Sequence, residues 1–194
     1  MATRTQVDLV TRTTLEGDLL EGAWATYQVA FDRLRVLAVQ RHLMTRAEFD
    51  DVCADRRVMK YLGLDDDGRV CAFGTFTNHL SAMPLVSEEY FAHRWPQLHA
   101  AGKIWYIGCV GVHPDYRSSG VFARMVSQMC AVVERTGGVA SIDICRHNEQ
   151  DLALPRLITR LVDTVSDGTK VHRLDEQTYW AYEFPEPALA SSWR

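Results

Sequence analysis

Residues 103–134 read KIWYIGCVGVHPDYRSSGVFARMVSQMCAVVE and have the pattern of one strand, one tight turn and one helix. Ile104–Val112 is apolar apart from Tyr106, which predicts a strand buried on both faces. His113-Pro114-Asp115 ends that strand, because proline has no N–H to donate to a neighbouring strand. Ser118, Ser119 and Gly120 then open a helix with one apolar stripe, formed by Phe122, Met125, Val126, Met129, Val132 and Val133.

The junction Arg117–Ala123 has the properties of an anion-binding site. The first amides of a helix have no acceptor within the helix and lie at the positive end of its dipole. The small residues Ser118, Ser119 and Gly120 allow a ligand to approach this backbone closely. We therefore expect the junction to bind an anion such as a pyrophosphate.

The string VGVHPDYRSSGVFARM, residues 110–125, resembles the acyl-CoA binding signature R/Q-x-x-G-x-G/A of the GCN5-related N-acetyltransferases, the GNAT superfamily. Arg117–Gly120 matches its first four positions, whereas Phe122 stands where a second small residue is expected, with Ala123 next to it. The resemblance spans about residues 7–184. It implies an α/β fold with a mixed, mostly antiparallel central sheet, splayed central strands and flanking helices. It also implies an N-acyltransferase that uses acetyl-CoA or another acyl-CoA and no metal.

The same resemblance implies where the donor binds. The strands Ile104–Val112 and Val139–Cys145 splay apart in this fold and admit the pantetheine arm between them. A strand amide near Val110 would polarise the thioester carbonyl. Asn148 matches the place of an asparagine that often binds the cofactor amide in the family. The residues implied to bind the donor are Val110, Gly111, Val112, Arg117, Ser118, Ser119, Gly120, Val121, Phe122, Ala123 and Asn148.

Composition and charge restrict the class of protein. A chain of 194 residues fits a single domain, residues 1–194, and its hydrophobic share of 47% is ordinary for a globular protein. A net charge of −4 argues against nucleic acid as a partner, and no apolar run is long enough to span a membrane. The N-terminus lacks the apolar core of a signal peptide. The five cysteines form no CxxC pair or zinc spacing, which predicts reduced thiols in the cytoplasm.

Apolar periodicity and turn residues predict the other elements. Asp65-Asp66-Asp67-Gly68 is a hairpin turn between two strands, and its aspartates are expected to be solvated rather than metal-bound. Thr45 and Glu48 form a capping box at a helix start, and residues 36–44 either continue a helix or cross the sheet. The expected strands are Val7–Arg12, Val58–Leu64, Val70–Thr77 and a closing hairpin of Val171–Leu174 and Thr178–Phe184. The expected helices are Leu15–Leu34, Thr45–Ala54 and Asp151–Val165, before a tail at Pro185–Arg194.

Aromatic residues in two segments are candidates for contact with the acceptor. The first helix lines the acceptor cleft in the GNAT fold, so Trp24, Tyr27 and Phe31 are candidate contacts, although core packing explains their spacing and is favoured. Residues 78–102 form a connection that is longer than usual and contain Tyr90 and Trp95, with a short helix beginning at Ser87. This insertion is either a wall for the acceptor or acyl chain, or a surface helix packed on the sheet.

The candidates for proton transfer are Tyr106, Asp143 and Glu89. Tyr106 alternates with Ile104 and Gly108 on one face of the central strand, and a phenol suits donation to a leaving thiolate better than action as a base. Asp143 is either a base or a structural partner, because a carboxylate in an apolar strand is costly unless it is hydrogen-bonded. The helix predicted at residues 151–165 lacks the tyrosine that many GNAT enzymes have there as the acid.

Three functions fit these features. The first is an N-acetyltransferase for a small-molecule or peptide amine, acting by direct transfer in a ternary complex. The second is an N-acyltransferase for longer acyl groups, carried by CoA or by an acyl-carrier protein, which the aromatic insertion and Phe122 favour. The third is a non-catalytic module that binds acyl-CoA as a sensor or docks on a partner, which the missing tyrosine favours. A homodimer is compatible with each of them.

Overall fold

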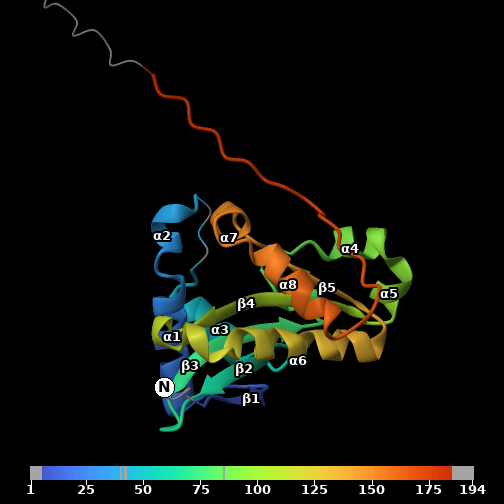
Figure 1. Ribbon diagram of the computed structural model, residues 1–194. Coiled ribbons are helices and arrows are strands. Elements are labelled where there is room, and N and C mark those ends of the chain that lie inside the picture. The colour runs from blue at the N-terminus through green and yellow to red at the C-terminus, as the bar shows by residue number, and fades with distance from the viewer. Residues whose placement is uncertain (1–5, 40, 42, 85, 185–194) are drawn as a thin grey trace, which may run out of the picture.

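A computed structural model describes residues 6–39, 41, 43–84 and 86–184, in which a five-stranded sheet lies between two layers of helices (Figure 1). The strands lie side by side in chain order: β1 (Asp8–Arg12), β2 (Met59–Leu64), β3 (Val70–Thr77), β4 (Ile104–Val112) and β5 (Val139–Ile142). Neighbours from β1 to β4 pair antiparallel, and β5 pairs parallel with β4. This mixed, mostly antiparallel sheet confirms the predicted fold class.

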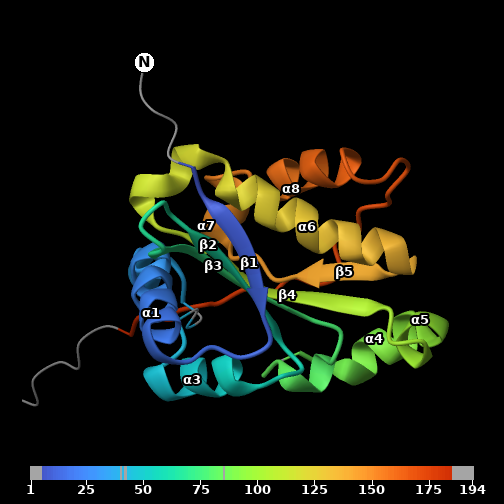
Figure 2. The ribbon, with the colours of Figure 1, turned by 90° about the horizontal axis from the view of Figure 1, so that it is seen from below.

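Helices cover both faces of the sheet (Figure 2). One face carries α1 (Gly17–Phe31) and α3 (Arg46–Ala54), and the other carries α6 (Val121–Thr136) and α8 (Leu154–Asp163). The shorter helices are α2 (Leu34–Leu37), α4 (Glu88–Arg94), α5 (Pro96–Ala100) and α7 (Arg146–Gln150), and the 3₁₀ turns are η1 (Leu80–Ala82) and η2 (Pro114–Ser119).

Local sequence signals set the ends of these elements, and the predicted capping box and hairpin turn are present. Thr45 and Glu48 form the capping box of α3. Gly137 adopts a left-handed φ of 65° and ends α6. Asp65 shapes the hairpin turn between β2 and β3, because its Oδ1 accepts hydrogen bonds from the amides of Asp67 and Arg69 at 3.0 and 2.9 Å.

Three clusters of buried side chains make up the core. The stripe of α6, including Met125 and Met129, packs with Ile107 on one face of the sheet. On the opposite face Tyr27, Phe49 and Phe73 join α1, α3 and β3, with ring centroids 5.0–6.3 Å apart. A third cluster lies where β4 begins and consists of Leu80, Phe91, Ile104 and Tyr106.

Three predicted boundaries are corrected. Ser118 and Ser119 belong to η2, and α6 begins at Val121, because Gly120 interrupts the helix with a left-handed φ of 77°. β5 ends at Ile142 rather than at Cys145. The helix predicted from Asp151 begins at Leu154 instead, because Ala153 adopts a left-handed φ of 50° and separates α8 from α7.

The predicted closing hairpin of Val171–Leu174 and Thr178–Phe184 is wrong for this chain, because no strand forms over these described residues. Leu174 packs against the third cluster, and its carbonyl accepts a hydrogen bond from the Tyr90 hydroxyl at 3.4 Å. Over residues 175–184 the chain runs away from the body in an extended conformation (Figure 1). An extended segment becomes a strand only when it pairs with an edge, and this one meets none. The predicted tail Pro185–Arg194 lies outside the described residues.

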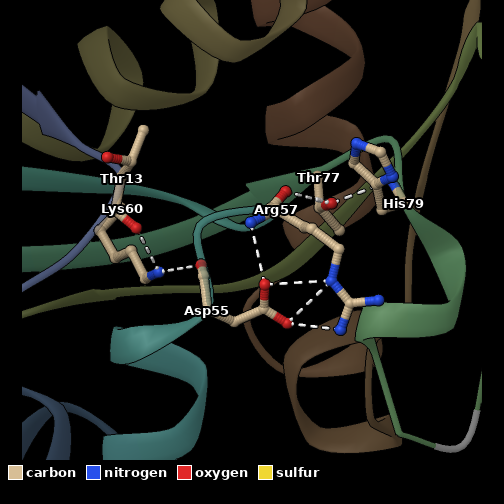
Figure 3. Close-up of polar contacts among 6 residues, drawn as sticks. All are labelled: Thr13, Asp55, Arg57, Lys60, Thr77 and His79. Carbon is tan, nitrogen blue, oxygen red and sulfur yellow. Dashed lines mark hydrogen bonds and ion pairs between the residues drawn. The ribbon is translucent and has the colours of Figure 1, made fainter.

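A polar network ties together the ends of three strands (Figure 3). Lys60 of β2 is fully buried, and its Nζ donates to the carbonyls of Thr13 and Asp55 at 2.9 and 2.6 Å. The Asp55 carboxylate is paired with Arg57 at 2.7 Å. The Arg57 carbonyl in turn accepts a hydrogen bond from the Thr77 hydroxyl at 2.8 Å. The network holds the chain where β1 ends, where β2 begins and where the insertion leaves β3.

The buried charge of Lys60 predicts a pH-dependent stability. Burial lowers the pKa of Lys60 from 10.5 to about 8. Between these values the unfolded chain binds more protons than the folded chain, so this group makes the free energy of unfolding rise with pH. Between about pH 8 and 10.5 we expect the free energy of unfolding of wild type to rise relative to that of Lys60→Met. The rise is at most about 1.4 kcal/mol per pH unit. Urea unfolding at several pH values measures this gain, and parallel curves for the two proteins would contradict the lowered pKa.

Candidate active site

β4 and β5 pair over four positions and then separate. The paired positions run from Ile104↔Val139 to Ile107↔Ile142. β4 continues to Val112, whereas β5 has already ended. The splayed central strands predicted from the resemblance are therefore present, and the far half of β4 faces a gap where its backbone groups are not paired with β5.

The backbone of Val110 is directed toward this gap. The His113 N–H donates to the Cys71 carbonyl of β3 at 2.9 Å, so Gly111, two residues before His113, also turns its backbone groups toward β3. Val110 and Val112 then turn their N–H and C=O groups to the opposite side, where β5 is absent. The Val110 amide is thus available as a donor for a carbonyl oxygen placed between the diverging strands.

A bulge in β4 lies next to the point of divergence. Thr75 pairs with Cys109 and Phe76 pairs with Ile107, so Gly108 is an extra residue in β4. A Cβ atom at Gly108 would lie 2.6 Å from both Met83 Cε and Thr75 Oγ1, which leaves room for glycine alone. Met83, from the insertion, therefore closes this face of the bulge.

The turn after β4 is held in place by a contact from another hairpin. The Tyr116 hydroxyl in η2 donates to Asp65 Oδ2 in the β2–β3 turn at 2.6 Å. This bond to the carboxylate raises the pKa of Tyr116 to about 12, and it lowers the pKa of Asp65. Both groups therefore keep the protonation states that the bond requires across the physiological range. The aspartate that shapes one turn also positions the turn that leads to Gly120.

Free amides are presented at the start of α6. The Arg124 N–H donates to the Gly120 carbonyl at 3.2 Å, and the Val121 N–H donates to Ser119 Oγ at 3.2 Å. By helix geometry the amides of Phe122 and Ala123 are then left for an external acceptor. The helix is 16 residues long, so its dipole adds a favourable field for an anion.

These features fit an acyl-CoA donor. The gap beyond Ile142 suits an extended arm, the Val110 amide suits the thioester carbonyl, and the amides of Phe122 and Ala123 suit a pyrophosphate. Asn148 lies in α7, directly after the chain leaves β5. Among the residues that the structure describes, no group of three or more His, Cys, Asp or Glu side chains could hold a metal ion.

Tyr106 and Asp143 meet across the divergence of the two strands. The Tyr106 hydroxyl donates to Asp143 Oδ1 at 2.5 Å. Tyr106 is 9% exposed, and its burial, reinforced by the charge of Asp143, raises the pKa of Tyr106. The phenol therefore stays protonated at neutral pH. Asp143 lies just past the end of β5 and is exposed, so the carboxylate expected inside an apolar strand is at the surface of the gap.

Glu89, the third candidate for proton transfer, is exposed in the first turn of α4. Its carboxylate accepts a hydrogen bond from the Ser87 hydroxyl at 3.3 Å, and Ser87 caps the same helix. No described contact brings Glu89 to Tyr106 or Asp143. A carboxylate at a helix N-terminus stabilises the helix, which is sufficient reason for Glu89 at this position.

A family model supplies the deciding comparison, because the model of the acetyltransferase (GNAT) family matches residues 19–157, more than half of the chain. The chain belongs to the GNAT acetyltransferase family. This confirms the resemblance inferred from residues 110–125 and makes the chain an acyltransferase by family. No curated protein sequence matches it significantly. No helix in the described residues is long and apolar enough to cross a bilayer.

Solved structures of other GNAT proteins share the fold. The ribosomal-protein-S18-alanine N-acetyltransferase from Escherichia coli has a TM-score of 0.50 and 14% identity, over 78% of this chain and 76% of that chain. The aminoglycoside acetyltransferase HMB0005 from an uncultured soil metagenomic sample has a TM-score of 0.50 and 15% identity. The match covers 90% of this chain and 99% of that chain. The aminoglycoside acetyltransferase meta-AAC0020, also from an uncultured soil metagenomic sample, has a TM-score of 0.50 and 11% identity. The match covers 89% of this chain and 97% of that chain. At these identities the likeness concerns the fold alone.

The aromatic residues of the first GNAT helix lie mainly in the core. Tyr27 is 2% exposed, and its hydroxyl accepts a hydrogen bond from the Met44 amide at 2.8 Å. Trp24 packs on Phe49, with ring centroids 5.1 Å apart. Phe31 is partly exposed, and a Cβ atom built on Gly111 would lie 2.7 Å from its Cε2, so the Phe31 ring lies directly against β4. The structure supports the core interpretation for Tyr27, and Phe31 stays a candidate acceptor contact.

The insertion at residues 78–102 packs on the beginning of β4 rather than standing apart from the sheet. Phe91 and Trp95 stack at 6.2 Å and join the third cluster with Tyr106. Tyr90 is 39% exposed on the outer side of α4. The insertion therefore forms a wall on the face of β4 that carries Tyr106 and Gly108, and it is also part of the core.

Three residues of the site are missing from the sequence-based prediction of site residues. Asp65 and Tyr116 are 51 positions apart, and only the folded chain brings them together. Met83 carries no motif, and its role depends on the bulge at Gly108. The turn pattern at residues 65–68 predicts that Asp65 shapes the hairpin turn. It does not predict that the second carboxylate oxygen of Asp65 binds the Tyr116 hydroxyl.

Removing the charge of Arg117 is expected to weaken donor binding. The Arg117 side chain is exposed and has no described ion pair, so it is available to a phosphate. Arg117→Ala is expected to lose about 1.5–3 kcal/mol of binding free energy if the guanidinium contacts the pyrophosphate. The loss is expected to shrink at high salt, because solvent-exposed charges are screened. Calorimetry with CoA at two salt concentrations measures both effects. Equal affinity at low salt would mean that the backbone amides act alone.

Proposed function

We propose that this chain is an N-acetyltransferase that transfers the acetyl group of acetyl-CoA directly to an amine in a ternary complex. The observation that carries the proposal is the Tyr106–Asp143 pair beside the gap between β4 and β5. It supplies a protonated donor and a carboxylate at the point where the Val110 amide faces the same gap. The third interpretation, a non-catalytic module, has no need of such a pair.

The pair offers a complete path for the proton. The Asp143 carboxylate accepts a proton from the acceptor ammonium, so that the neutral amine attacks the acyl carbon. The C–N bond forms, the C–S bond breaks, and the Val110 amide stabilises the oxygen that becomes negative. Tyr106 donates its proton to the leaving thiolate and recovers one from Asp143. The acceptor nitrogen loses two protons in all. One reaches the thiol through Asp143 and Tyr106, and the other passes from the nitrogen to solvent as the C–S bond breaks, so both side chains return to their starting states.

In this mechanism Tyr106 acts as the acid, the role that many GNAT enzymes give to a tyrosine in the helix after β5. α8 contains no tyrosine, so the hydroxyl comes from β4 and is directed to the gap by the bond to Asp143. Burial keeps the phenol protonated until it is needed, because the same burial raises its pKa. Holding donor and acceptor together supplies much of the remaining rate enhancement.

A release assay with a panel of acceptors tests the proposed function. Purified full-length protein is mixed with acetyl-CoA and amines of three classes: aminoglycosides, small polyamines and N-terminal peptides. Ribosomal-protein and aminoglycoside acetyltransferases share this fold, which is why two of these classes are included. Amine-dependent thiol release supports the proposal. Tight CoA binding without release in any class would favour the non-catalytic module.

Met83 is expected to restrict the length of the acyl group. Its side chain fills the space beside Gly108, which precedes Val110 by two positions in β4. Met83→Ala is expected to raise kcat/KM for butyryl-CoA relative to acetyl-CoA by about tenfold, because methylenes in a fitted apolar site are worth about 1–3 kcal/mol each. Met44→Ala is a matched control, since Met44 packs against the α1–α3 cluster. An unchanged ratio in Met83→Ala would place the acyl group elsewhere.

A further inference from the structure

An ion pair joins the chain beyond α8 to the helix that follows β5. Arg173 Nη2 lies 3.1 Å from Glu149 Oε2 in α7 and 3.5 Å from Glu176 Oε2. The Glu149 side chain is 33% exposed, so part of its carboxylate faces solvent. Glu176 belongs to the same extended segment as Arg173, whereas Glu149 is held in a helix. Glu149 is therefore a fixed carboxylate whose cation is supplied by a separate segment of the chain.

This ion pair lies beside the proposed catalytic pair. Leu174 follows Arg173 directly and packs against the third cluster, which contains Tyr106. Glu149 follows Asp143 by six positions, three of them within α7, so their Cα atoms are at most about 15 Å apart. Because Tyr106 is bonded to Asp143, the contacts run in a closed ring from Asp143 through α7 and the ion pair back to Tyr106.

The other cations of α7 are engaged with partners of their own. Arg146 Nε donates to Gln150 Oε1 at 2.9 Å, and His147 Nδ1 lies 2.7 Å from Asp151 Oδ2. In the described part of the chain, the cation paired with the Glu149 carboxylate is therefore Arg173 alone. If Arg173 moves away, this carboxylate is left to a cation from outside the chain.

We propose that Glu149 binds a second cationic group of the acceptor, and that Arg173 occupies this position while no acceptor is bound. The inference rests on the proposed function, in which Asp143 receives the proton of the first ammonium. An acceptor with two amino groups places one at Asp143 and the other at Glu149. The acceptor class is then a diamine or polyamine rather than a monoamine.

Replacing one cation by another at Glu149 costs little. Arg173 is 59% exposed and lies on a segment without helix or strand. Exposed ion pairs of this kind shift an equilibrium by a factor of about five at most. The ammonium of a bound acceptor gains a charge-assisted hydrogen bond to a partly buried carboxylate, and no helix or strand has to open for it.

Kinetics with matched amines test the proposal. Diamines from 1,3-diaminopropane to 1,6-diaminohexane are each compared with the monoamine of the same chain length, at saturating acetyl-CoA. We expect wild type to favour the best diamine by at least about tenfold in kcat/KM, the lower end for a hydrogen bond to a charged group. Glu149→Gln is expected to lose this preference. Arg173→Gln removes the competing cation and is expected to raise kcat/KM for that diamine by about two- to fivefold.

The matched control is Glu134→Gln, which neutralises an exposed glutamate of α6 and is expected to keep the wild-type preference. If wild type shows no preference for diamines, or Glu149→Gln retains it, this inference is overturned. Amine-dependent thiol release in the same assays would then still support the proposed function. If no amine gives thiol release, the inference and the proposed function are both overturned.

Proteolysis tests the tie between Arg173 and α7 without any substrate. Trypsin cleaves after arginine, so releasing Arg173 exposes the bond between Arg173 and Leu174. Glu149→Gln keeps this cleavage site and is expected to be cut there about two- to fivefold faster than wild type. Glu134→Gln is expected to be cut at the wild-type rate. Equal rates in all three proteins would show that Glu149 does not hold Arg173 and would overturn the proposal.

Discussion

Gly120→Glu is expected to abolish donor binding, with a loss of more than a hundredfold in affinity for CoA. The glutamate would place a negative charge where the amides of Phe122 and Ala123 await an anion. Two charge-assisted hydrogen bonds at about 1.5–3 kcal/mol each correspond to at least this factor. Calorimetric titration with CoA measures the loss, and thermal unfolding monitors the fold.

A control for backbone strain is essential, because Gly120 has a left-handed φ of 77° and any side chain there is strained. Gly168 has a φ of 75°, lies after α8 and has open space at its Cβ position. Gly168→Glu therefore carries the same charge and a similar strain without touching the start of α6. We expect it to bind CoA as wild type does. A Gly120→Glu protein that is folded and binds CoA normally would show that the anion site is elsewhere.

Removing the hydroxyl of Tyr106 or the charge of Asp143 is expected to reduce turnover while donor affinity stays intact. Tyr106→Phe keeps the ring that packs in the third cluster and loses the bond to Asp143, and we expect at least a tenfold fall in kcat. Asp143→Asn removes the proposed base, and we expect a fall of about 10²–10⁴.

Matched substitutions separate chemistry from packing. Tyr61→Phe alters a buried tyrosine on the α6 face, and Asp67→Asn alters an exposed carboxylate in the β2–β3 turn. Both variants are expected to have the same kcat as wild type. Wild-type turnover in Tyr106→Phe and Asp143→Asn would remove the pair from the mechanism and leave Glu89 as the remaining carboxylate to test. If the double substitution costs no more than Asp143→Asn alone, the two side chains act as one unit.

The local part of the fold was readable from the sequence. The apolar run of Ile104–Val112, the proline after it and the stripe of α6 are patterns of neighbouring residues, and the strand and helix they predict are present. The capping box at Thr45 and the turn at Asp65 are equally local. The signature around Gly120 predicted the family for the same reason, because a helix N-terminus that can hold an anion is built from consecutive residues.

Only the tertiary structure decided which distant groups meet. Tyr106 and Asp143 are 37 positions apart in the sequence, and only the folded chain joins them in a hydrogen bond. Residues 178–184 have the alternation of a strand, but alternation says nothing about which edge is available, and so the closing hairpin was predicted wrongly. Periodicity reports the conformation that a segment prefers, whereas pairing and proton transfer depend on partners that the chain supplies only by folding.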